Sequence, residues 1–323
     1  MGVIQNSKKW VVLVHGGAGA MRSMSAAKEA QYRAGLEAAV RAGVHVLNSD
    51  GEAVDAAIAA VSSMEQSCAF NAGHGSCLSE AGRVEADAAV MDGRDLSYGG
   101  VAAIPDLGNA VLLADAVRRH SPHCLFAGQQ ALASLTALPG ADCEFVEPSE
   151  DRLKQFRAQK DKRFGTNVSE DDLADMGGTH DEGDTVGAVV LDTRGHLAAA
   201  VSTGGLWLKA SGRVGDSPVA GAGLWAEDGQ VACATTGTGE FILRGALASE
   251  LKHYVQRGLS IEAAGVATIE ALRARFGPGR AGLIGVDPQG AITTAFDTAG
   301  MGRAWLREGE STVTVRVWPE EDG

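Results

Sequence analysis

Apolar residues along the chain follow two patterns. Short alternating or continuous apolar runs are typical of strands, and longer stretches with apolar residues three and four positions apart are typical of helices. In the first half of the chain these patterns predict strands at Val11–Val14, Val84–Met91 and Gly100–Ile104, and helices at Ala26–Leu47, Val54–Met64, Asn109–Arg119 and Cys124–Leu135.

A polar stretch then interrupts the apolar pattern. Residues 147–184 are dominated by Glu, Asp, Lys and Arg, so we expect a solvated linker there. The pattern resumes at Thr185 and predicts strands at Thr185–Leu191, Leu197–Thr203, Leu224–Trp225, Gln230–Thr236, Ala281–Val286, Ala291–Phe296 and Thr312–Val317, and helices at Glu240–Val255 and Ile261–Phe276. This grouping of elements favours an α+β fold over regular βαβ winding. We expect one domain, built from halves 1–184 and 185–323.

Composition and charge narrow the function. The 323 residues are 45% hydrophobic and carry a net charge of −13, which fits a globular protein and opposes binding to nucleic acid. No stretch has the length of a membrane span or of a signal-peptide core. The five cysteines are odd in number and form no CxxC pair, so we expect reduced thiols and a cytoplasmic protein.

Two glycine-rich segments, His15–Ala20 and Asn71–Ser76, suggest a phosphate or nucleotide site. Neither has the Lys-Ser/Thr ending of a P-loop, and neither completes GxGxxG. A non-enzymatic phosphate or nucleotide binder therefore remains one alternative from the residues alone.

The junction of Asp184 and Thr185, where the charged stretch meets an apolar strand, offers a second interpretation. A threonine hydroxyl is a weak nucleophile unless a base lies beside it, and cleavage before Thr185 would supply an α-amine on the same residue. Such an amine has a pKa of about 8 and accepts a proton near neutrality. A threonine that merely starts a strand gives the same local pattern.

Three later motifs add chemistry to this junction. A hairpin would bring Thr203 beside Thr185, where its hydroxyl could orient the nucleophile. Arg213 and Asp216, flanked by glycines, could bind the carboxylate and ammonium of an α-amino acid or form a surface ion pair. The segment 236–240 before a helix could form an oxyanion hole, a phosphate-binding turn or a plain helix cap.

Taken together, the motifs resemble one known family. In order along the chain they are HGGAGA at 15–20, FNAGHGS at 70–76, SPH at 121–123, DTVGAVVLD at 184–192, STGG at 202–205, GRVGDSP at 212–218 and TGTGE at 236–240. They resemble the plant-type asparaginase / isoaspartyl peptidase family of N-terminal nucleophile hydrolases, and the resemblance runs from Val11 to about Trp305.

The resemblance implies a four-layer αββα sandwich, a single domain that cleaves itself into α and β subunits. It implies hydrolysis of β-aspartyl (isoaspartyl) dipeptides and L-asparagine to release L-aspartate. It also implies a dimer of cleaved αβ units and no organic cofactor.

The resemblance also implies a role for each matching residue. The catalytic residues are Thr185, Thr203, Thr236, Gly237 and Asn71; the substrate-binding residues are Arg213, Asp216 and Gly237; the residues of self-cleavage are Asp184, Thr185, His15, Gly16 and Gly17; and a structural Na⁺ would be held by backbone carbonyls in the segment of Met64, Glu65, Phe70 and Asn71.

One position departs from the family pattern. Many members have glycine before the nucleophile, whereas this chain has Asp184. An Asp-Thr junction resembles the related glycosylasparaginases, so a glycosylasparaginase-like hydrolase is the alternative within this class. The glycine loops and TGTGE favour the isoaspartyl branch. A binding protein that never cleaves itself is a further alternative.

Overall fold

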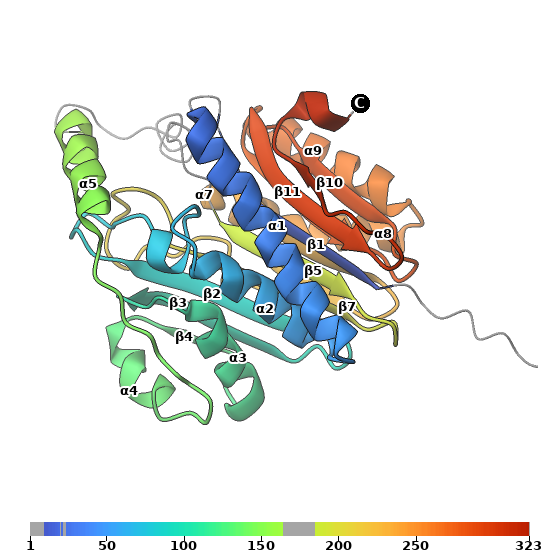
Figure 1. Cartoon of the computed structure of the whole chain (residues 1–323), viewed down its shortest axis with the longest axis horizontal. Helices are drawn as coiled ribbons and strands as arrows, with labels where there is room; N and C mark the ends of the chain where they lie inside the picture. The colour runs from blue at the N-terminus through green and yellow to red at the C-terminus, as the bar shows by residue number, and fades with distance from the viewer. Residues whose placement is uncertain (1–9, 20, 22–23, 164–184, 323) are drawn as a thin grey trace, which may run out of the picture.

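The computed structural model describes residues 10–19, 21, 24–163 and 185–322, and two β-sheets form its centre (Figure 1). The larger sheet has eight strands in the order β12 (Thr314–Arg316), β11 (Gly300–Arg307), β1 (Val11–Gly19), β5 (Val186–Leu191), β6 (Leu197–Thr203), β2 (Glu85–Asp92), β3 (Tyr98–Pro105) and β4 (Leu125–Ala127). The smaller sheet has four strands in the order β10 (Ile292–Phe296), β9 (Ala281–Val286), β8 (Val231–Gly237) and β7 (Leu224–Glu227). Neighbouring strands are antiparallel except β3 and β4.

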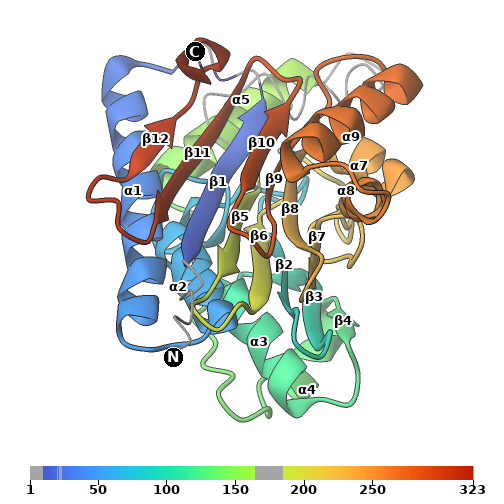
Figure 2. The same ribbon diagram turned by 90° about the vertical axis from the view of Figure 1, so that its right-hand side faces the viewer.

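Helices cover the outer face of each sheet. Against the larger sheet pack α1 (Ala26–Asn48), α2 (Ala53–Glu65) and α3 (Ala110–His120), and against the smaller sheet pack α8 (Leu247–Gln256) and α9 (Ile261–Phe276). Figure 2 shows α1 and α9 on opposite sides of the molecule. The other helices of the described ranges are α4 (Leu132–Leu135), α5 (Glu150–Arg163) and α7 (Gly239–Gly245), and the 3-10 turns are Gly73–Gly75, Gln129–Ala131 and Pro319–Asp322. No helix in the described ranges is long and apolar enough to cross a membrane.

The alternation of side chains along the strands decides which residues lie between the two sheets. In β5, Val186 and Val190 pack toward the helices, whereas Val189 and Leu191 pack toward the smaller sheet. Because successive strand residues point to opposite faces, Thr185, one position before the strand, points toward the smaller sheet. The space between the sheets is apolar along most of its length and becomes polar at this end.

The expected α+β class is confirmed, and most predicted strands and helices are present. The predicted helix Cys124–Leu135 is wrong over most of its length. Residues 125–127 instead form the edge strand β4, and only α4 at its end is an α-helix. Gly128 follows β4 with φ 73°, outside the helical region, and so separates the strand from the turn that precedes α4.

The predicted linker 147–184 is also wrong in its first half, because α5 spans Glu150–Arg163. Two of its few apolar residues, Leu153 and Phe156, lie one turn apart and pack against a small cluster that includes Leu78 and Trp207. The remaining part of that prediction, residues 164–184, lies outside the described residues.

Two other boundaries differ from expectation. The single helix predicted over Glu240–Val255 is two helices, because Ala246 adopts a left-handed conformation with φ 46° between α7 and α8. The glycine segment after Val14 is not a loop, because β1 continues to Gly19 with a bulge where the register shifts between His15 and Gly17.

Candidate active site

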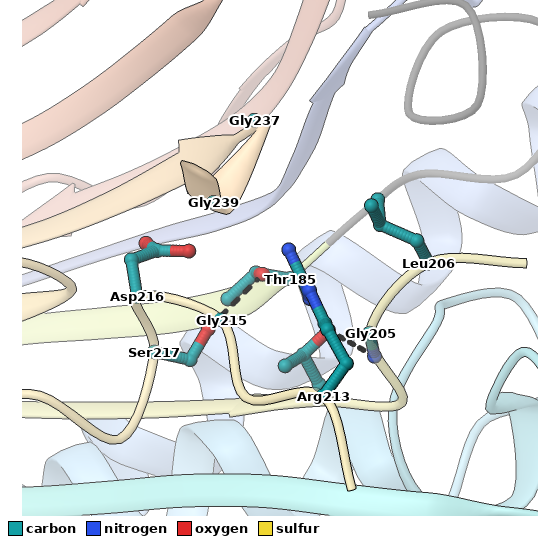
Figure 3. Close-up of a pocket in the computed structure, with 10 residues that line it drawn as sticks. Thr185, Gly205, Leu206, Arg213, Gly215, Asp216, Ser217, Gly237 and Gly239 are labelled. Carbon is teal, nitrogen blue, oxygen red and sulfur yellow. Dashed lines mark hydrogen bonds between the residues drawn. The ribbon is translucent and has the colours of Figure 1, made fainter. Parts of the chain in front are cut away.

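A pocket opens at the polar end of the space between the sheets (Figure 3). Its walls come from the start of β5, the end of β6, the loop that follows β6 and the end of β8. The lining residues are Thr185, Thr203, Gly205, Leu206, Arg213, Gly215, Asp216, Ser217, Gly237 and Gly239. The structure therefore brings together residues from three motifs that are separated by up to about fifty positions in the sequence.

Thr185 lies at the base of this pocket with only 4% of its surface exposed. Its hydroxyl oxygen lies 3.2 Å from the hydroxyl oxygen of Ser217, at hydrogen-bonding distance. Thr185 is the first residue that the structure describes after Arg163, and Asp184, the residue predicted to precede the cleaved bond, lies outside the described residues.

The hairpin predicted from the sequence is present, because β5 and β6 pair with Val186 opposite Ser202. This register places Thr203 at the same end of the sheet as Thr185, and both line the pocket. The hydroxyl of Thr203 accepts the N–H of Gly205 at 3.0 Å, which tightens the turn directly after β6.

Asn71 braces that same turn from outside the pocket. Its side-chain amide donates to the carbonyl of Gly205 at 2.6 Å, and its backbone carbonyl accepts the N–H of Gly204 at 3.1 Å. Its side-chain oxygen accepts the N–H of Cys77 at 2.7 Å. All of these bonds are to backbone groups, so in this structure Asn71 acts on the turn after Thr203.

Arg213 is bound by a carboxylate of the protein itself. Its Nε and Nη2 donate to the two oxygens of Glu240, each at 2.8 Å, in a bidentate pair. Burial lowers the pKa of Arg213, but the bonds and charge of Glu240 outweigh burial and raise the pKa above its usual value. One edge of the guanidinium is thus fixed by Glu240, and Arg213 lines the pocket together with Asp216.

Asp216 is buried and titrates at an unusual pH. Burial raises the pKa of its carboxyl group to about 6, and a hydrogen bond from Thr235 (3.0 Å) opposes this rise. The two charged groups approach each other at Gly239. A Cβ atom added there would lie 2.8 Å from Nη2 of Arg213 and 2.9 Å from an oxygen of Asp216, so only glycine fits between them.

Thr236 and Gly237 form the end of β8, which faces the start of β5 across the two sheets. The Thr236 hydroxyl donates to the backbone carbonyl of Thr185 at 3.5 Å. Gly237 has φ 130°, and a Cβ there would lie 2.4 Å from the carbonyl oxygen of Arg280. A side chain is therefore excluded at a position that lines the pocket.

Comparison with known proteins identifies the family. The family model described as asparaginase matches residues 8–315. The chain belongs to the asparaginase family. The match covers the smaller sheet, the larger sheet up to the edge strand β12, and every residue that lines the pocket.

Several curated relatives are similar to this asparaginase-family chain over nearly its whole length. The plant-type L-asparaginase of Pyrobaculum calidifontis is 42% identical over 93% of this chain and 97% of its own. The isoaspartyl peptidase of Escherichia coli is 38% identical over 95% of both chains. The isoaspartyl peptidase/L-asparaginase of Homo sapiens is 35% identical over 93% of this chain and 94% of its own.

The segment expected to influence self-cleavage lies beside Thr185 in this family member. His15 is fully buried in β1 and packs against Gly187, where a Cβ would lie 2.3 Å from its Nε2. Burial lowers the pKa of His15 to about 3, against a hydrogen bond with the Thr185 backbone, so the imidazole is neutral at physiological pH. At Gly16, a Cβ would lie 2.7 Å from both Phe70 and Tyr32. The packing of this segment leaves no open phosphate loop at His15–Gly17.

The segment expected to hold a structural cation, residues 64–71, runs from the end of α2 into the turn that follows it. Carbonyl oxygens of this segment crowd two glycines just beyond it: a Cβ would lie 2.4 Å from the carbonyl oxygen of Glu65 at Gly73, and 2.0 Å from that of Phe70 at Gly75. The carbonyl of Met64 accepts the N–H of Ser67 at 3.1 Å. Among the residues that the structure describes, no three His, Cys, Asp or Glu side chains gather as a metal site. A cation would therefore depend on carbonyl oxygens, which suit hard cations.

Two residues that lie near the reacting groups in this chain were not singled out from the sequence. Ser217 lies within GRVGDSP and approaches the Thr185 hydroxyl, and Glu240 lies within TGTGE and holds Arg213. A helix cap is one interpretation of the segment 236–240, but the Glu240 side chain at its end crosses instead to the loop after β6. Only the fold shows that the two motifs face each other.

Proposed function

We propose that this chain is a self-cleaving N-terminal-threonine amidohydrolase that hydrolyses β-aspartyl dipeptides and L-asparagine to release L-aspartate. The observation that carries the proposal is one pocket lined by a threonine hydroxyl, a fixed guanidinium and a buried carboxyl group, those of Thr185, Arg213 and Asp216. The names of the relatives support the same two substrates.

The proposed architecture is the four-layer αββα sandwich of N-terminal nucleophile hydrolases, as one domain of two halves. The first half, 1–184, becomes the α subunit, and the second half, 185–323, becomes the β subunit. The packing of helices on the outer face of each sheet supports this arrangement.

Self-cleavage generates the nucleophile in this proposal. The Thr185 hydroxyl attacks the carbonyl carbon of Asp184, and the chain shifts from the nitrogen to the oxygen of Thr185, which turns the amide into an ester. Water hydrolyses the ester and leaves a carboxylate on Asp184 and a free α-amine on Thr185. His15, which is buried and neutral and lies beside Gly16 and Gly17, forms a rigid side of the site where this step takes place.

Substrate hydrolysis then uses the new amine. The amine takes the proton of the Thr185 hydroxyl, and the oxygen attacks the β-carbonyl of the substrate. The Thr236 hydroxyl and the Gly237 N–H stabilise the oxyanion, each by about 3 kcal/mol in comparable enzymes. The amine or ammonia leaves with the proton, and water cleaves the β-aspartyl ester to release L-aspartate.

The two charged groups define the substrate class. We assign the α-carboxylate of the substrate to Arg213 and its α-ammonium to Asp216, on opposite sides of Gly239. With Nε and Nη2 bound to Glu240, Arg213 meets the substrate through its remaining edge. Both substrate groups must be free, so the leaving group on the β-carbonyl is less constrained.

The experiment that tests this proposal is a substrate panel. Purified, cleaved protein should release aspartate from β-Asp-Leu and from L-asparagine. Glutamine should be poor, because its extra methylene displaces the carbonyl from Thr185, and α-Asp-Leu should fail, because its α-carboxyl group is in the peptide bond. Hydrolysis of glycosylasparagine with β-Asp-Leu untouched would instead establish the glycosylasparaginase alternative, which the Asp184–Thr185 junction favours.

Three accompanying proposals concern the surroundings of the site. We propose a structural Na⁺ held by backbone carbonyls around Met64, Glu65, Phe70 and Asn71, which would fix Asn71 against the turn after Thr203. We propose a dimer of cleaved αβ units, and chemistry that needs no organic cofactor. We also propose a cytoplasmic enzyme, since all five cysteines are free thiols.

A further inference from the structure

A buried carboxyl group, that of Asp87, lies beside the pocket and has no part in the reaction described above. In β2, Ala89 and Met91 point into the space between the sheets, and Asp87 takes the next such position toward the pocket, directly opposite Thr203. Its exposed fraction is 0%. Burial of a carboxylate is unfavourable unless its oxygens are bonded and its charge is compensated.

One oxygen of Asp87 supports an irregularity in the sheet. Its Oδ1 accepts the N–H of Ala103 at 2.7 Å. The pairing of β2 with β3 shifts register between Ala86 and Ala88, and Ala103 has a positive φ of 49°. Such bulges redirect side chains next to active sites, and non-glycine residues with positive φ persist only where neighbours hold them.

The other oxygen of Asp87 reaches the substrate loop. Its Oδ2 accepts the N–H of Gly215 at 3.3 Å, and Gly215 lies between Arg213 and Asp216 in the chain and in the pocket wall (Figure 3). A second acid from the same strand acts on the same loop, because Glu85 accepts the N–H of Gly212 at 2.8 Å. The loop that carries both proposed anchors is therefore tied to β2 at two backbone amides.

The charge of Asp87 is compensated by two cations, the buried Lys209 and the partly buried Arg213. Lys209 is 3% exposed and donates to the carbonyl of Glu85 at 2.6 Å. Burial lowers the pKa of Lys209, and the charge of Asp87 opposes this effect. Asp87 also attracts the guanidinium of Arg213. The carboxylate thus lies in the field of both cations while it bonds to the backbone of the loop between them.

We infer that Asp87 is a positioning residue for substrate binding. Through the Gly215 amide it fixes the distance between Arg213 and Asp216. Through its position opposite Thr203 it also places these two residues relative to the nucleophile. The inference rests on the proposed roles of Arg213 and Asp216. Asp87 is absent from the pocket lining, so it acts through the loop and not by contact with the substrate.

The test uses the full-length, self-cleaved protein and one matched pair of variants. Asp87→Asn keeps the shape of the side chain and removes its charge. Asp92→Asn is the control, because Asp92 lies in the same strand, is 2% exposed and also accepts a backbone N–H, but pairs with Ala198 at the opposite end of the sheet. Leucine release from β-Asp-Leu gives KM and kcat, and added L-aspartate gives its inhibition constant.

Asp87→Asn should raise KM and the inhibition constant of L-aspartate together, by about tenfold or more, with a smaller fall in kcat, since small misplacement of binding groups weakens binding steeply. Asp92→Asn should change both constants by less than about twofold, whatever its effect on the melting temperature. Both constants belong to the folded enzyme, so partial unfolding of a preparation does not alter them.

Other results would overturn the inference. Unchanged constants in Asp87→Asn would remove Asp87 from this role, and failure of that variant to cleave itself would assign Asp87 to maturation instead. If Asp87→Asn does not accumulate, the double variant Asp87→Asn/Lys209→Met removes both charges. It should accumulate and show a raised inhibition constant relative to Lys209→Met alone; equal constants would contradict the inference. Parallel measurement of Arg213→Lys separates failure of this inference from failure of the proposed function. An unaltered inhibition constant of L-aspartate in that variant would refute the assignment of the substrate α-carboxylate to Arg213.

Discussion

The charged side chains of the pocket are held by protein partners. Glu240 fixes one edge of Arg213, and Thr235 bonds to Asp216. Fixed groups of this kind bind a ligand without first losing conformational freedom, which is the general advantage of preorganisation. The way these particular groups are held leads to three predictions.

Arg213→Lys should lower kcat/KM for β-Asp-Leu by about ten- to a hundredfold. A lysine keeps the positive charge, but its single ammonium cannot bind both oxygens of Glu240 and also meet a substrate carboxylate. Steady-state kinetics on fully cleaved protein measure this effect, and intact mass confirms cleavage beforehand. Wild-type kinetics in the matured variant would place the α-carboxylate elsewhere.

Asp216 should link substrate binding to pH. Because burial raises the pKa of Asp216 to about 6, its carboxylate is lost as the pH falls through 6, and with it the partner of the substrate ammonium. The inhibition constant of L-aspartate should therefore increase below about pH 6. A constant that stays flat between about pH 5 and 8 would contradict the assignment.

The same shift has the opposite sign for stability. Between the usual pKa of 3.8 and the folded value of about 6, the folded state binds the proton more tightly, so ionisation of Asp216 destabilises the fold as the pH rises through this window. Asp216→Asn should therefore be more stable at pH 8, by up to about 3 kcal/mol, while it loses affinity for L-aspartate. Chemical denaturation at pH 8 measures the first effect, and reduced stability would count against the buried charge.

At the scale of elements, the sequence predicted what is local and periodic. The strands that frame the pocket are nearly continuous apolar runs, and α1 and α9 have serine N-caps whose hydroxyls accept the N–H three residues on. What the sequence did not predict depends on distant partners. Strand β11 exists because β1 pairs with it, and β4 exists because β3 offers an open edge.

The same difference between local features and distant partners applies to the active site. Thr185, Thr203, Arg213 and Asp216 lie in motifs that the sequence presents, and they meet in one pocket. The residues that hold them, such as Glu240 and Asp87, come from other elements. The sequence alone does not show which distant residues lie close together in the fold. Whether each motif residue performs its expected role is decided by kinetics, not by its position.

The break between α7 and α8 gives a test at this scale. Ala246 adopts a left-handed conformation with φ 46°, which is unfavourable for residues with a Cβ by about 1–2 kcal/mol. Ala246→Gly should raise the unfolding free energy by about 0.5–1 kcal/mol after the added chain entropy of glycine. Activity should be unchanged, because the residue lies outside the pocket lining. A destabilised variant would show that another contact requires alanine there.

At the scale of the whole molecule, the two halves of the chain are interleaved. The larger sheet takes β1 to β4 from the first half and β5, β6, β11 and β12 from the second, and β1 lies between β5 and β11. Strand β1 is thus hydrogen-bonded on both sides to strands from the second half, and β2 is bonded to one, β6. Cleavage before Thr185 would therefore leave two chains that remain associated through the sheet.

The proposed mechanism depends most directly on that cleavage, and the intact mass of the purified protein tests whether the cleavage occurs. Denaturing mass spectrometry should find fragments 1–184 and 185–323, of roughly 19 and 14 kDa in proportion to their lengths, from the 33.2 kDa chain. Sequencing of the smaller fragment should begin at Thr185, and Thr185→Ala should remain a single inactive chain. Full hydrolysis of β-Asp-Leu by a protein that stays uncut would contradict the proposed mechanism, because the free α-amine of Thr185 that acts as the base would then be absent.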